Sequence, residues 1–105
     1  DWENEVPVKI FSKGELQWEF DMDSELAKEN YRFEFIQLSG KAYKAIEDTL
    51  IIDKTVYCKM ESLNDTLLNK FFGKSVTLKG RVLGYNRASK KLRLDKCFIL
   101  KSPGA

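Results

Sequence analysis

The side chains that could do chemistry in this chain are cations and tyrosines rather than acid–base pairs. The 105 residues contain no His, which is the usual general base of enzymes and the commonest zinc ligand. The two cysteines, Cys58 and Cys97, cannot form an ordinary four-ligand zinc site without His or further Cys. We therefore expect a protein that is not an enzyme and that holds no metal and no cofactor.

Basic residues are concentrated in the C-terminal third. Residues 70–105 hold 10 Lys and Arg against Asp95 alone, whereas residues 1–69 hold 8 Lys and Arg against 15 Asp and Glu. Cations attract the phosphates of a single-stranded nucleic acid, and aromatic rings stack on its bases. We interpret this mixture as a nucleic-acid-binding face. Its candidate residues are Tyr43, Tyr57, Lys59, Lys79, Arg81, Tyr85, Arg87, Lys90, Lys91 and Arg93.

A purely structural interpretation of the same residues stays open. The tyrosines could pack at the rim of a barrel, and lysines on an exposed strand keep its edge from pairing with other chains.

Two seven-residue stretches share one pattern and indicate how these side chains are positioned. Residues 36–42 read IQLSGKA and residues 76–82 read VTLKGRV. Alternation with a period of two is typical of a half-buried strand. A glycine inside a strand costs stability, so Gly40 and Gly80 predict a bend or a close backbone approach in each strand.

A helical lead-in is expected before the strands. Residues 1–11 are predicted to form a loosely held, extended N-terminal arm. Ser12 and Glu15 have the spacing of a capping box, which predicts a helix beginning at Ser12. Asp23 and Ser24 offer the cap of a short second helix or turn.

The remaining pattern predicts five strands and one further helix. The apolar phase of the last strand shifts near Asp95, which predicts a bulge there. Residues 62–73 have helical spacing, and Gly73 can end that helix in the left-handed conformation. The predicted strands are residues 33–46, 49–53, 55–60, 74–85 and 92–100.

Five strands with a helix between the third and the fourth are the order of the OB-fold. We therefore expect a mainly β, five-stranded Greek-key OB-fold barrel. Residues 12–101 would form one domain that includes the helical lead-in of residues 12–31, followed by a tail of residues 102–105. The first and fourth strands are neighbours in this fold, so Gly40 and Gly80 would mark the bends of two adjacent strands.

The third and fifth strands are also neighbours, which would bring Cys58 and Cys97 near each other. Both cysteines stand at apolar positions of their strands, so we expect buried, reduced thiols. A disulfide between them is the alternative if the protein is exported.

Several short motifs are similar to the tRNA_anti-like family of bacterial OB domains. They are Leu16 with Phe20, Ala27 with Tyr31, IQLSGKA, VYCKM, FFGKSVTLKGRVLG and DKCFIL. The family usually has Gly and Lys after the Tyr, where this chain has Arg32 and Phe33. The resemblance implies an OB barrel and, by association with anticodon-binding relatives, a nucleic-acid ligand.

Taken alone, the sequence favours a non-enzymatic OB-fold module that binds single-stranded nucleic acid or a similar polyanion. The alternative is a protein-interaction module of an envelope or secreted protein, whose acidic lead-in and basic hairpin contact a protein partner. No apolar run approaches the roughly 20 residues of a membrane helix. The chain starts at Asp1, so we expect that its N-terminus has been processed, and the compartment stays open.

Overall fold

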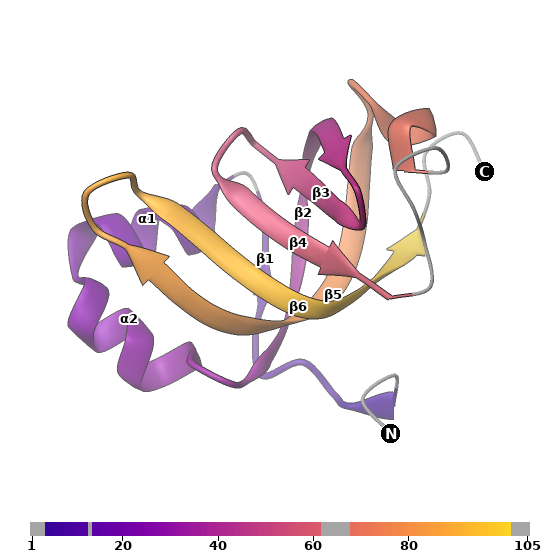
Figure 1. Ribbon diagram of the computed structural model, residues 1–105. Coiled ribbons are helices and arrows are strands. Elements are labelled where there is room, and N and C mark those ends of the chain that lie inside the picture. The colour runs from indigo at the N-terminus through magenta and orange to yellow at the C-terminus, as the bar shows by residue number, and fades with distance from the viewer. Residues whose placement is uncertain (1–3, 13, 62–67, 102–105) are drawn as a thin grey trace.

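Alternating apolar side chains build five strands that close into a barrel (Figure 1). The computed structural model describes residues 4–12, 14–61 and 68–101. The sheet order is β2-β3-β4-β6-β5, and pairing of β2 with β5 closes it. This mainly β architecture confirms the fold expected from the sequence and is consistent with an OB-fold. The barrel strands are β2 (Phe35–Ile46), β3 (Thr49–Ile52), β4 (Val56–Met60), β5 (Ser75–Asn86) and β6 (Lys91–Lys101).

The two similar stretches of sequence pair with each other. In the antiparallel ladder of β2 and β5, Leu38 lies opposite Leu78, and both side chains are buried. Gly80 lies opposite Ile36, and Gly40 lies opposite Val76. The shared pattern therefore gives two adjacent strands matching faces toward the core.

The helical lead-in covers one end of the barrel with α1 (Glu15–Met22) and α2 (Ser24–Tyr31), as Figure 1 shows. The side chain of Asp23 caps α2 by accepting a hydrogen bond from the Leu26 N–H at 3.1 Å, as expected. The first helix begins three residues later than predicted. Glu15 Oε1 accepts from the Ser12 N–H at 2.6 Å, but Gly14 has a φ of 79°, which is left-handed and not helical.

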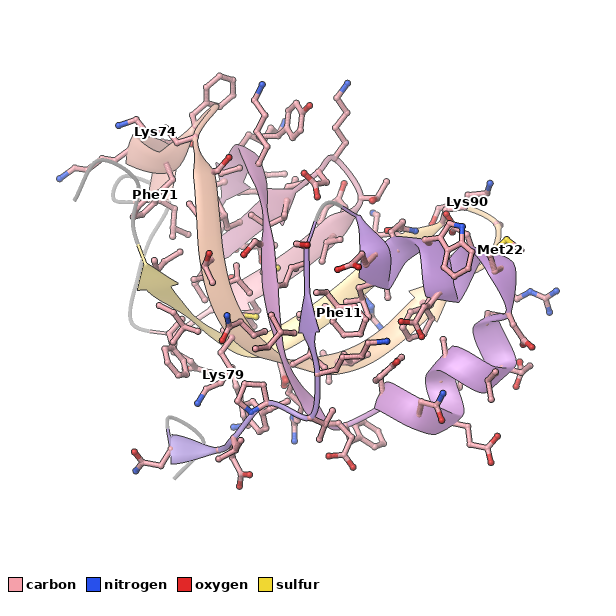
Figure 2. All side chains as sticks on the ribbon, turned by 180° about the vertical axis from the view of Figure 1, so that it is seen from behind. Phe11, Met22, Phe71, Lys74, Lys79 and Lys90 are labelled. Atoms are coloured by element: carbon pink, nitrogen blue, oxygen red, sulfur yellow. The ribbon has the colours of Figure 1, made fainter. Side chains whose placement is uncertain are left out.

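The N-terminal arm is attached to the barrel at its last two residues, where the sequence had indicated only a loosely held segment. Residues Ile10–Phe11 form β1, which pairs in parallel with β2. Phe11, labelled in Figure 2, is fully buried. Its ring meets that of Tyr31 edge-on, with 5.3 Å between ring centroids. β5 occupies one edge of β2 at residues 35–41 and β3 occupies the other edge only from Ala42 onward. The arm therefore satisfies backbone groups of β2 that β3 does not reach.

The last strand contains the expected irregularity beside Asp95. The pairing of β6 with β4 shifts register between Leu94 and Cys97, and Lys96 has a φ of 51°. This bulge lets Leu94 and Cys97 both point into the core, where both are buried.

The helix predicted between the third and fourth barrel strands falls partly on residues 62–67, which lie outside the described residues. The described part is the short 3-10 turn η2 (Asn69–Phe71), preceded by the buried Leu68. Gly73 has a φ of 77°, as expected for a left-handed stop. No helix in the described ranges has the length and apolar character needed to span a membrane.

Candidate nucleic-acid interface

The outer face of β4 and β6 carries the central pair of candidate residues. Val56, Cys58 and Met60 point into the core, so Tyr57 and Lys59 point outward, as expected from the period of the strand. Tyr57 is half-buried and lies directly opposite Arg93 on the parallel neighbour β6. Lys59 is exposed two residues further along the same face.

A second cation lies on the ring of Tyr57. The Nζ atom of Lys91, at the start of β6, is 4.3 Å from the centroid of that ring. This distance is within the range of a cation–π interaction. Tyr57, Lys91 and Arg93 therefore form one cluster, which we call the Tyr57 cluster. A base that stacks on the covered side of the ring must displace Lys91, whose ammonium would then be free for a phosphate.

Tyr43 belongs to another group of cations on the barrel surface. It stands at the irregularity between Ala42 and Lys44 in the pairing of β2 with β3. Lys41 and Lys54 place their ammonium groups 5.6 and 5.2 Å from its ring centroid. Sequence reasoning missed Lys41 and Lys54. Lys41 stands two residues before Tyr43 in β2, so the alternation of the strand could have indicated it. Lys54 follows β3 and reaches Tyr43 only because β3 pairs with β2.

Lys79 and Arg81 are engaged in contacts within the chain. Lys79 is only 5% exposed, and its Nζ donates a hydrogen bond to the Glu5 carbonyl at 2.6 Å. Figure 2 shows Lys79 beside the N-terminal segment. The guanidinium of Arg81 donates two hydrogen bonds to the Asp95 carboxylate, at 2.9 and 2.7 Å. This pairing raises the pKa of Arg81 further and compensates its charge.

Tyr85 packs at the barrel rim, which is the structural alternative to a nucleic-acid-binding role for the tyrosines. Its ring lies 5.3 Å from that of Phe20, centroid to centroid, and its hydroxyl donates to Asp21. Burial and this hydrogen bond raise the pKa of Tyr85 to about 12. The side chain thus fastens β5 to α1.

Arg87 and Lys90 are exposed on the loop between β5 and β6. The loop is held to α1 because Gln17 Nε2 donates to the Lys90 carbonyl at 2.8 Å. Both cations line a hollow together with Asp21 and other carboxylates of the lead-in. These carboxylates therefore partly neutralise the positive potential of Arg87 and Lys90, whereas no carboxylate lines the cavity beside the Tyr57 cluster.

A cavity of about 470 Å³ lies between α2 and the hairpin of β5 and β6. It is lined by Lys91 and Arg93 of the Tyr57 cluster and by two cations that sequence reasoning missed, Lys28 and Arg32. Lys28 is on α2, and Arg32 is the residue that ends this helix, four positions later, so the helical period places both near one side of the helix. The sequence shows the spacing of Lys28 and Arg32, but it does not show which strand residues these two side chains face.

The fold and this outer face define a barrel protein of the OB-fold kind. No family model matches the chain, and no curated protein matches it either. The resemblance to the tRNA_anti-like family is therefore one of short motifs. Among solved structures, the barrel is similar to the crystal structure of a "putative nucleic acid-binding lipoprotein" from Klebsiella pneumoniae subsp. pneumoniae MGH 78578. The TM-score is 0.66 at 16% identity, over 88% of this chain and 91% of that one, which is a likeness of fold.

Proposed function

We propose that this protein is a non-enzymatic OB-fold module that binds single-stranded nucleic acid across the outer face of β3, β4 and β6. The observation that carries the proposal is the Tyr57 cluster: one tyrosine opposite Arg93, with Lys91 4.3 Å from its ring centroid. OB-folds use the corresponding second and third barrel strands and the flanking loops for this purpose. The aromatic ring would stack on a base, and the two cations would contact phosphates.

The expected affinity is modest and depends on salt. Stacking of one base on an aromatic side chain contributes about 1 to 3 kcal/mol. Each phosphate contact releases counterions, so its contribution falls as the salt concentration rises. Tyr43 with Lys41 and Lys54 offers a second ring with cations, on a neighbouring part of the barrel.

Binding without catalysis is the simplest role for these residues. The chain has no His to act as a general base near neutral pH. Among the described residues, no group of three or more His, Cys, Asp or Glu is placed to hold a metal ion. Nucleic-acid binding is also the activity in the name of the Klebsiella protein, whose similar fold lends the proposal some support.

Titration of labelled single-stranded DNA and RNA at low salt tests the proposal. The variant Lys91→Glu with Arg93→Glu should abolish binding, because it reverses both charges of the Tyr57 cluster. Lys70→Glu with Lys74→Glu is the control: it reverses two charges as well, both exposed. Lys74 lies at the opposite end of the barrel from Lys90, which directly precedes Lys91 (Figure 2). Equal losses in both variants, or no binding by the unchanged protein at roughly 100 μM, would refute the proposal.

A protein partner is the second candidate, favoured by an apolar groove on the lead-in. Trp18, Met22 and Leu26 are 63%, 67% and 53% exposed and line a groove of about 230 Å³. Glu19 and Asp23 line it as well. Lys9 already pairs with Glu19, so the occupant would be a partner segment with apolar side chains and a cation that faces Asp23.

Calorimetric titration with a helical Leu/Lys peptide tests the second candidate, with a Leu/Glu peptide as the charge control. The variant Trp18→Ser with Met22→Ser should remove the binding. Phe72→Ser removes an equally exposed apolar side chain elsewhere and should leave binding unchanged. Binding of both peptides alike would contradict a groove with this charge preference.

A further inference from the structure

The cavity between α2 and the hairpin of β5 and β6 has four cations in its lining. Lys28 and Arg32 come from α2 and the residue after it, and Lys91 and Arg93 come from β6. No carboxylate is among its lining residues, which otherwise are Leu83, Gly84, Tyr85, Asn86 and Ser89. Positive charge thus converges on this hollow from two separate elements.

These cations have little compensation from acidic neighbours. Within the described residues, Arg32, Lys91 and Arg93 form no ion pair, and Lys28 meets Glu25 only at 3.8 Å, near the surface. Arg81 shows the contrast, because the bidentate pair with Asp95 satisfies its guanidinium. A cluster of uncompensated cations around a concave space attracts anions strongly.

Gly84 leaves the space beside Arg93 open. A Cβ atom at Gly84 would have one neighbour within 4 Å, a guanidinium nitrogen of Arg93 at 3.9 Å. Gly84 stands at a register shift in the pairing of β5 with β6, but it has no positive φ and a Cβ atom there would meet no clash, so neither a left-handed backbone nor core packing requires glycine. Since glycine weakens a strand, its presence here fits a site that a ligand approaches closely.

We propose that this cavity binds a phosphate monoester, namely the terminal phosphate of the strand whose bases cross Tyr57. The inference rests on the proposed function, because Lys91 and Arg93 belong both to the cavity and to the Tyr57 cluster. A phosphate monoester carries about −1.5 to −2 charges near pH 7 and presents three acceptor oxygens. Such a group matches four converging cations better than a diester with one charge does. The planar forks of Arg32 and Arg93 suit bidentate contacts to phosphate.

Lys28 and Arg32 also have an ordinary role, since cations near a helix C-terminus interact favourably with the helix dipole. That role accounts for their charge on α2. It does not account for Gly84, nor for Lys91 and Arg93 lining the same space. If Lys28 and Arg32 only stabilise the helix, their variants should lose stability and keep phosphate binding. If they bind phosphate, the variants should lose that binding.

The test compares oligonucleotides of one sequence that end in a 5′-phosphate, a 3′-phosphate or hydroxyls only. We expect one phosphorylated form to bind about tenfold more tightly, the size of one good charge-assisted contact. Gly84→Leu fills the cavity without removing charge, and Lys28→Gln with Arg32→Gln removes charge without filling it. Both variants should lose the tenfold preference and keep the affinity for the hydroxyl-ended strand. Lys70→Gln with Lys74→Gln is the control and should keep the preference.

Equal affinity for all three ends would overturn the inference and leave the proposed function standing. Should no oligonucleotide bind, titration of a mononucleotide and of inorganic phosphate decides the cavity separately. If the mononucleotide or inorganic phosphate binds, and the variant Lys28→Gln with Arg32→Gln abolishes that binding, the cavity is a site for a free phosphate ligand. Absence of both would overturn the phosphate site. Circular dichroism of each variant shows whether it is folded.

Discussion

Gly80 on β5 faces the thiol of Cys97 on β6 so closely that a Cβ atom at Gly80 would overlap Sγ. A Cβ at Gly40 would likewise overlap Ile52 and lie 2.6 Å from an Asp53 carboxylate oxygen. Both glycines of the paired motifs are therefore required by close approach. Gly84 on β5 is not, because a Cβ there has open space.

Alanine substitutions should separate these glycines by their effect on stability. Gly80→Ala and Gly40→Ala should each lower the free energy of unfolding by about 1 to 3 kcal/mol, because the added methyl overpacks the barrel wall. Gly84→Ala should stay within about 0.5 kcal/mol of the unchanged protein, or gain slightly, because it meets no clash and restricts the unfolded chain. Urea unfolding measures all three. Similar values for Gly80→Ala and Gly84→Ala would contradict the close approach.

The two cysteines should be reduced and slow to react in the folded protein. Cys58 and Cys97 are both fully buried free thiols on adjacent strands. Burial, reinforced by the neighbouring Cys58 side chain, raises the pKa of the Cys97 thiol and suppresses the reactive thiolate. Labelling with a chromogenic disulfide reagent at pH 8 should be slow without denaturant and rapid for both cysteines in guanidinium. Rapid native labelling would show that the barrel opens readily at this place.

Acid should weaken the attachment of β1 to the lead-in through Glu19. Lys9 Nζ donates to Glu19 Oε2 at 2.8 Å, and the Tyr31 hydroxyl donates to Glu19 Oε1 at 2.8 Å. Burial opposes ionisation of Glu19, but these hydrogen bonds outweigh it and lower the pKa of Glu19. A carboxylate with a lowered pKa stabilises the fold above its unfolded pKa of about 4.3 and loses this effect as the pH falls through its folded value.

The variant Glu19→Gln should therefore be less stable at pH 7 and should lose less stability than the unchanged protein between pH 5 and about pH 3. Urea unfolding across this pH range measures both effects. Glu29→Gln, on an exposed position of α2, is the control and should change neither. An unchanged acid dependence in Glu19→Gln would contradict the role of this hydrogen-bonded group.

Salt dependence should separate stacking from phosphate contacts in the proposed interface. Replacing Lys91 and Arg93 by Gln removes two phosphate contacts, so the slope of log affinity against log salt should fall by about 1.4 for a single strand. Tyr57→Ala should weaken binding by about 1 to 3 kcal/mol and leave the slope unchanged, because stacking releases no counterions. Fluorescence anisotropy at several salt concentrations measures both. A change of slope in Tyr57→Ala would mean that the ring does not act by stacking.

The local pattern of the sequence determined the barrel strands, the second helix cap and the bulge in β6. Periodicity, caps and turn glycines act over a few residues, so Asp23, Gly73 and the shift beside Asp95 were predictable without tertiary contacts. The alternation in β4 likewise indicated that Tyr57 faces outward. Only two residues of the N-terminal arm form β1, and so short a segment has no recognisable period.

Tertiary structure alone decided which cations act together. Lys28 and Arg32 meet Lys91 and Arg93, more than fifty residues further along the chain, because α2 lies beside the hairpin of β5 and β6. Pairing of β5 with β6 likewise places Arg81 opposite Asp95, which compensates the charge of Arg81. The sequence gives the sign of each charge but not its position in space. The strength of an electrostatic site depends on the distances between charges, which strand pairing and helix packing set.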